Sequence, residues 1–125
     1  MKNILIIDDE KILAAALLRA LERKLPRGEF AVHQINSSTE AIQHISAHSD
    51  IDLIFLDYLM PELNGGDVLD WVKKTFPKIK VVLMTAYGDQ DTKDGFIRRG
   101  ALHVLSKPFD DILKISDLAL KILAD

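Results

Sequence analysis

The sequence has no cysteine and no long apolar run, and both absences exclude classes of protein. Without thiols the chain forms no disulfide and no thiolate metal site. No apolar segment approaches the ~18 residues that a membrane helix needs. The apolar segment nearest the start, residues 4–7, is too short for the core of a secretory signal. We therefore expect a cytoplasmic protein that does not insert into a membrane.

A basic excess and a glycine-rich phosphate loop are also missing. The 16 Lys and Arg residues are outnumbered by 19 Asp and Glu residues, which gives a net charge of -3. No basic stripe stands out, and this counts against direct binding of nucleic acid. Asp8 and Asp9, rather than glycines, follow the first apolar segment, which counts against a dinucleotide or flavin site.

The length and composition that are present suit one globular unit. The chain has 125 residues, of which 48% are hydrophobic and 28% charged. A chain of this size buries roughly two-thirds of its unfolded surface, which is enough for its own core. We expect residues 1–125 to form a single domain. Because the last helical pattern reaches the C-terminus, no second domain is expected to follow in this chain.

Five short segments have the length and composition of buried strands. The longest are continuous apolar runs rich in Val, Ile and Leu, which is typical of parallel strands covered on both faces. The segments are residues 4–7, 30–32 with an extension to 35, 53–56, 81–84 and 102–105.

Five helical segments alternate with these strands, at residues 10–25, 38–48, 67–76, 88–100 and 110–123. The fourth has only Phe96 and Ile97 as apolar anchors and contains Gly95, so we expect a short or mobile helix. This alternation predicts an α/β protein with a doubly wound, five-stranded parallel sheet. Right-handed crossovers then place helices on both faces of the sheet.

Charged and polar residues follow four of the predicted strands. Asp8 and Asp9 follow the first, Asp57 the third, Thr85 the fourth and Lys107 the fifth. In open α/β sheets, ligands bind beyond the carboxyl ends of the strands. We therefore expect these five side chains to lie at one edge of the sheet.

This set of residues favours phosphoryl transfer with a magnesium ion. Three carboxylates that lie close together repel one another, and a hard divalent cation such as Mg²⁺ relieves the repulsion. Lys107 and the cation would stabilise the oxygens of a phosphoryl group, and Thr85 would donate a hydrogen bond to one of them. Asp57 is the candidate nucleophile because it stands alone, whereas Asp8 and Asp9 form a metal-holding pair.

Each residue taken alone also has an ordinary structural interpretation. The acids after the first strand would suit the start of a helix, and Thr85 would suit a helix N-cap. Asp57 would be a polar strand end and Lys107 a solvated surface lysine. The convergence of all of them on one predicted edge favours the chemical interpretation.

Four motifs carry a resemblance to a known family. They are Asp8-Asp9-Glu10, "LDYLMPELNG" at residues 56–65, "MTAYGD" at 84–89 and "SKPF" at 106–109. In this order and spacing they resemble the receiver domain of bacterial two-component response regulators. The resemblance covers the whole chain and implies a flavodoxin-like fold with strand order 2-1-3-4-5.

The resemblance implies that Asp57 accepts a phosphoryl group. The donor would be a phosphohistidine on a sensor histidine kinase or a histidine phosphotransfer protein, or a small acyl phosphate. Asp8, Asp9, Asp57 and the backbone carbonyl of Leu59 would hold Mg²⁺. Such a domain is a switch that assists its own phosphorylation and dephosphorylation rather than an enzyme.

The resemblance also assigns the remaining site residues and the output. Lys107 would contact the phosphoryl group, with a cis peptide bond to Pro108, and Thr85 would move toward the phosphoryl group after transfer. Output would use the face formed by the fourth helix, fifth strand and fifth helix, toward an effector protein or domain or a second copy. The family usually has an aromatic residue where this chain has Val104, so we hypothesise that output uses altered packing or mobility of residues 88–100.

Two other functions remain open. The first is a phosphate-independent interaction module with the same fold. The second is a metal-dependent hydrolase with an aspartate nucleophile, which usually has a second acid where Leu59 stands. Separately, His44 and His48 lie one helical turn apart and would chelate a metal only with a third ligand, whereas His33 and His103 have no partner by spacing.

Overall fold

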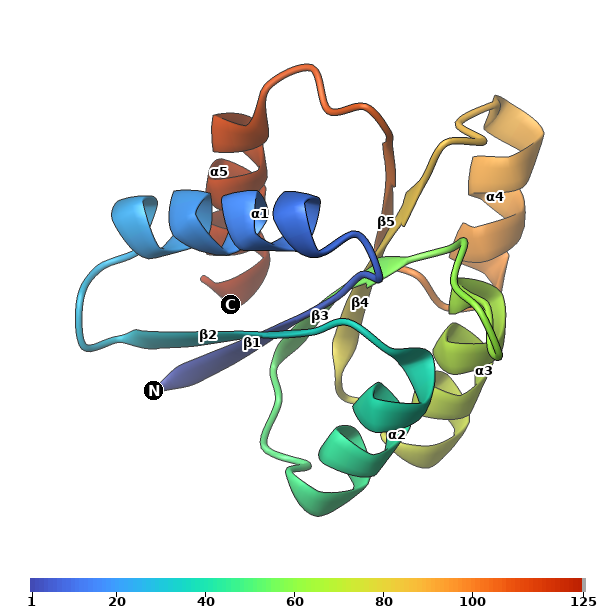
Figure 1. Ribbon diagram of the computed structural model, residues 1–125, viewed down its shortest axis with the longest axis horizontal. Helices are drawn as coiled ribbons and strands as arrows, with labels where there is room; N and C mark the ends of the chain where they lie inside the picture. Colours follow the sequence, from blue (N-terminus) through green and yellow to red (C-terminus); the bar gives the residue numbers. More distant parts are fainter. Residues whose placement is uncertain (125) are drawn as a thin grey trace.

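The computed structural model describes residues 1–124 and shows a five-stranded parallel sheet between two layers of helices (Figure 1). The strands lie in the order β2-β1-β3-β4-β5, which confirms the predicted flavodoxin-like topology. Every predicted strand is present, with ends that differ by one or two residues. The strands are β1 Lys2–Ile7, β2 Phe30–Ile35, β3 Leu53–Asp57, β4 Lys80–Thr85 and β5 His103–Ser106.

The helices cover both faces of the sheet, as right-handed crossovers require. Helices α1 and α5 lie on one face, and α2, α3 and α4 lie on the other (Figure 1). The fourth helix has nine residues and is the shortest of the five described, in line with its weak apolar pattern. The helices are α1 Lys11–Lys24, α2 Ser38–Ala47, α3 Gly65–Thr75, α4 Gln90–Arg98 and α5 Ile112–Leu123.

Successive residues of the central strands enter two different cores. In β1, Ile4 and Ile6 pack with α1 and α5, whereas Leu5 and Ile7 pack in the core that contains α2 and α3. Because side chains alternate across a strand, a strand covered on both faces is apolar at every position. This alternation explains the continuous apolar runs of the sequence.

The helix caps test one of the ordinary structural interpretations. Ser37 is the N-cap of α2, and Asp111 is the N-cap of α5. Thr85 is not a cap, because Asp89 accepts the hydrogen bond from the Thr92 backbone N–H at the start of α4. The interpretation of Thr85 as a helix cap is therefore wrong.

The strand register places the candidate site residues at one level. Ile7 pairs with Leu56 and Asp57 with Met84, so the residue after β1, Asp8, lies beside the end of β3. The peptide bond between Lys107 and Pro108 is cis, as the resemblance implies. Among residues 1–124, no helix has both the length and the apolar character to span a membrane.

Candidate functional site

Lys107 connects the acidic residues at the carboxyl edge of the sheet. Its Nζ donates to Asp8 Oδ2 and to Asp57 Oδ1, both at 2.9 Å, and to Glu10 Oε1 at 3.0 Å. The Asp8 and Asp57 residues are only 1% and 3% exposed, whereas Glu10 lies at the surface. The structure thus gathers residues from the ends of three strands, as the sequence predicted.

Three carboxylates share this edge. Asp8, Asp9 and Asp57 each offer one oxygen, and these three oxygens lie within 4.8 Å of one another. An all-oxygen set of this kind fits a hard cation such as Mg²⁺ better than it fits a soft transition metal. The donor chemistry of these side chains is therefore compatible with the magnesium site that the sequence predicted.

Burial and the neighbouring charges shift the pKa values of Asp57 and Lys107. Burial raises the pKa of Asp57 to about 7, with a further increase from the Asp8 charge, even though the hydrogen bond from Lys107 lowers it. Burial would lower the pKa of Lys107, but hydrogen bonds to Asp8, Asp57 and Glu10 raise it above its usual range. The ammonium therefore stays charged, and a second cation would relieve the remaining repulsion.

Of the two remaining candidate site residues, Thr85 is buried and Leu59 is exposed. Thr85 ends β4 with 2% of its surface exposed, and its Oγ1 accepts a hydrogen bond from the Tyr87 backbone N–H at 3.0 Å. Leu59 is 67% exposed and lines a hollow of about 500 Å³ together with Asp57 and Lys107. The hollow leaves room for a small polar group in front of Asp57.

The loop after Asp57 is held in place by contacts that the sequence does not reveal. The Ser38 hydroxyl donates to the Pro61 carbonyl at 3.1 Å and accepts from the Leu63 N–H at 3.3 Å. The Gly65 N–H donates to the Tyr58 carbonyl at 2.7 Å. The sequence does not indicate this role of Ser38, because no local pattern points to a partner 23 residues away.

An aromatic cluster connects the site to α4. The Tyr58 ring lies 6.5 Å from the Tyr87 ring and 5.2 Å from the Phe96 ring, measured between centroids. Val104, which stands where the family usually has an aromatic residue, is buried in the same core as Phe96. The sequence showed the departure at Val104 but not the cluster, because its three members come from separate segments.

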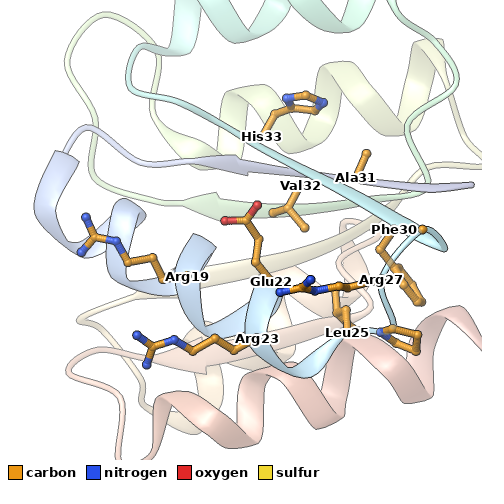
Figure 2. A pocket seen from close by; sticks show the side chains of 11 residues that line it. Arg19, Glu22, Arg23, Leu25, Arg27, Phe30, Ala31, Val32 and His33 are labelled. Atoms are coloured by element: carbon orange, nitrogen blue, oxygen red, sulfur yellow. The ribbon is translucent and has the colours of Figure 1, made fainter.

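A larger hollow, of about 750 Å³, lies elsewhere on the molecule. It is formed between the C-terminal end of α1 and the N-terminal end of β2, and Figure 2 shows Glu22 among Arg19, Arg23 and Arg27 in its lining. None of the carboxylates of the strand-end cluster lines it. It is at the wrong end of the sheet for the ligand site of an open α/β fold, so the smaller acidic hollow is the candidate site.

The fold and the site together define a class of protein: a flavodoxin-like domain with buried carboxylates and a lysine at the carboxyl edge of its sheet. The sequence pattern of the family described as "Response regulator receiver domain" matches residues 4–117. The chain belongs to this family.

Similar proteins agree with this assignment. The regulatory protein LuxO of Vibrio parahaemolyticus is 35% identical over 86 residues, which covers 68% of this chain and 19% of the relative. The nitrogen assimilation regulatory protein NtrX of Azorhizobium caulinodans is 30% identical over 125 residues, covering 97% of this chain and 26% of the relative. The chain thus spans about a fifth to a quarter of the length of these curated relatives.

Solved receiver domains have the same fold over nearly the whole chain. A response regulator receiver domain from Clostridium thermocellum superposes with a TM-score of 0.86 at 29% identity, covering 99% of this chain and 95% of that one. The receiver domain of NtrX from Brucella abortus superposes with a TM-score of 0.81 at 28% identity, covering 97% and 98%.

Proposed function

We propose that the protein is a phosphorylation-dependent signalling switch that accepts a phosphoryl group on Asp57 in the presence of Mg²⁺. One observation carries the proposal: the buried Asp57 carboxylate faces a hollow and lies beside Asp8, Asp9 and the Lys107 ammonium. Asp8, Asp9, Asp57 and the backbone carbonyl of Leu59 would hold the ion. When bound, Mg²⁺ supplies positive charge to the phosphoryl oxygens.

The transfer itself needs only groups that surround Asp57. A carboxylate oxygen of Asp57 attacks phosphorus, and the phosphorus–nitrogen bond of a phosphohistidine donor breaks. The electron pair of that bond returns to the donor imidazole, which then takes a proton from solvent. Lys107 Nζ, now held by Asp8 and Asp57, stabilises the charge on the transferred oxygens, and the Thr85 hydroxyl donates to one of them.

Labelling with a small acyl phosphate tests the proposal. The wild-type protein should gain one phosphoryl group, detected by intact mass, when Mg²⁺ is present and not when it is chelated. Asp57→Asn should abolish the gain, whereas Asp117→Asn, which changes an exposed acid of α5, should leave it intact. A folded wild-type protein that takes no label would instead favour the phosphate-independent interaction module.

Output would pass through α4. If the Thr85 hydroxyl turns to the phosphoryl group, it gives up its hydrogen bond to the Tyr87 N–H, and Tyr87 lies against Tyr58 and thereby close to Phe96. In this route, the contacts among Tyr87, Tyr58 and Phe96 would take the role that the family usually gives to an aromatic residue at the position of Val104. A phosphoryl mimic with Mg²⁺ should change amide hydrogen exchange in residues 88–100, and unchanged exchange there would rule the route out.

The partners follow from the same proposal. The donor would be a sensor histidine kinase or a histidine phosphotransfer protein, and the receiver of the signal an effector protein or domain or a second copy of the chain. Within the proposal, residues 1–125 form one receiver unit that acts in the cytoplasm without direct contact to nucleic acid. Pull-downs with and without the mimic test the partners, and cell fractionation tests the location.

A further inference from the structure

Three of the four histidines of the sequence gather on one side of the sheet. The ring of His44 in α2 stacks on that of His48, the C-cap residue of α2, with centroids 4.5 Å apart, and the His33 ring of β2 lies 6.5 Å from that of His44. His33 lies at the border of the arginine-lined hollow, and Figure 2 shows its ring on the side of β2 opposite to Glu22. Sequence spacing gave His33 no partner, and it is the fold that brings His33 close to His44.

The ring spacing is close to that of imidazoles which share a metal ion. With a metal–nitrogen bond of about 2.1 Å, two ring centroids in a tetrahedral site lie roughly 5 Å apart. The two measured separations fall on either side of that value. The ligand nitrogens do not all lie within 4.8 Å of one another as they stand, so binding requires ring rotation. His33 is exposed, which makes rotation of its ring inexpensive.

The protonation of the cluster also suits a metal. Burial and the neighbouring charges of His48 and His33 lower the pKa of His44, against an opposing effect of the Asp50 carboxylate. His44 is thus a neutral ligand near pH 7. His48 Nδ1 donates to the His44 carbonyl at 3.1 Å, which orients the ring and leaves Nε2 with its lone pair free.

We infer that His33, His44 and His48 form a binding site for one transition-metal ion such as Zn²⁺. Imidazole ligands select this class of ion, whereas the all-oxygen set at Asp57 suits Mg²⁺. The inference does not depend on the proposed phosphorylation, because the two sites share no residue.

Calorimetric titration of the untagged protein with Zn²⁺, in excess Mg²⁺ at pH 7.5, tests the inference. Wild type should bind one equivalent. His44→Asn and His33→Asn should each weaken binding about tenfold or more, since even indirect supports of a metal ligand contribute on that order. His103→Asn is the matched control, because His103 is an exposed histidine of β5, and it should leave binding unchanged. Equal loss in the control, or loss only in Asp57→Asn, would overturn the inference.

A second measurement locates the bound ion relative to the histidine rings, because paramagnetic broadening falls steeply with distance from the ion. Paramagnetic Co²⁺ should broaden the ring-proton NMR signals of His33, His44 and His48 at substoichiometric amounts, while the signals of His103 stay sharp. Broadening of His44 and His48 without His33 would indicate simple chelation along α2 and would refute the three-histidine site.

Discussion

Among single residues, Asp57 has the environment with the largest chemical consequence. Its carboxyl group is buried at the end of β3, and burial outweighs the Lys107 hydrogen bond, so its pKa rises to about 7. Burial therefore destabilises the ionised form of the Asp57 carboxyl group, and additional positive charge nearby would stabilise that form. The environment that would suit the proposed cation and phosphoryl group therefore costs folding stability.

The direction of the Asp57 pKa shift predicts how this loss of folding stability changes with pH. The folded pKa of Asp57, about 7, lies above the unfolded value of about 3.9. Below pH ~4 both states are protonated, so no stability is lost, and the loss grows as pH rises through the folded pKa. Asp57→Asn should therefore stabilise the metal-free protein by about 1–3 kcal/mol at pH 8, and by less at pH 5.

Urea unfolding in the presence of a chelator measures this difference. Asp117→Asn, at an exposed position of α5, should show no comparable pH-dependent gain. A gain for Asp57→Asn that is constant from pH 5 to pH 8 would contradict the raised pKa.

Lys107 and Glu10 contact each other, but their contributions to the free energy of unfolding should differ. Lys107→Met removes the ammonium from two buried carboxylates and should destabilise the protein by about 2–3 kcal/mol at pH 8. Glu10→Gln changes a side chain that is 62% exposed. Its effect should stay below about 0.5 kcal/mol. Because Lys107 is charged in both states below pH 10, the penalty of Lys107→Met should fall toward pH 5 through protonation of Asp57, whose pKa is about 7. Denaturation of both variants at the two pH values checks this, and equal losses would refute it.

Among the helices, glycine has different structural effects in α3 and in α4. A Cβ on Gly65, at the start of α3, would collide with the Asp57 carbonyl oxygen, so only glycine lets this helix begin directly against the end of β3. A Cβ on Gly95, inside α4, would meet nothing closer than the Arg98 side chain at 3.9 Å. Gly65 is thus required by close packing, whereas Gly95 only lowers the stability of α4.

Paired alanine substitutions test this contrast. Gly65→Ala should cost about 1–3 kcal/mol through overpacking, and should reduce phosphoryl labelling because Asp57 moves. Gly95→Ala should instead add about 0.5–1 kcal/mol, as expected for an unobstructed position inside a helix. Thermal denaturation and labelling of the two variants give the comparison. A stable, fully labelled Gly65→Ala protein would show that the loop adapts to the extra methyl group.

For the molecule as a whole, the proposed magnesium site would couple local ion binding to global stability. Its acids lie at the ends of β1 and β3, the strands that connect the two cores, so an ion that binds only the folded chain would stabilise both cores together. At 100 times its dissociation constant, Mg²⁺ should increase the unfolding free energy by about 2.7 kcal/mol.

Variants at the proposed ligands distinguish specific from general effects of the ion. Asp9→Asn should reduce the Mg²⁺-dependent rise in melting temperature. Leu59→Ala should preserve it, because only the backbone carbonyl of Leu59 is a proposed ligand. Equal rises in wild type and Asp9→Asn would show that the ion acts elsewhere.

Much of the fold and of the candidate site was predictable from the sequence. The apolar run at residues 53–56 followed by Asp57 predicted a buried strand that ends at a charged edge, and the structure places Asp57 there. Alternation and helical spacing are local properties, because each side chain's direction follows from the backbone geometry of its own element. The parallel topology then required the strand ends, and hence Asp8, Asp57 and Lys107, to meet.

Other features depended on the three-dimensional packing of distant segments. The contact of Lys107 with Glu10, the anchoring of the Pro61 loop by Ser38 and the approach of His33 to His44 each involve different elements. No periodicity encodes such contacts, because they depend on strand register and on how each helix is rotated against the sheet. The sequence alone therefore determined where the strands end, because that follows from local patterns. Only the folded structure decided which side chains of different elements contact each other, because those contacts depend on how the helices pack on the sheet.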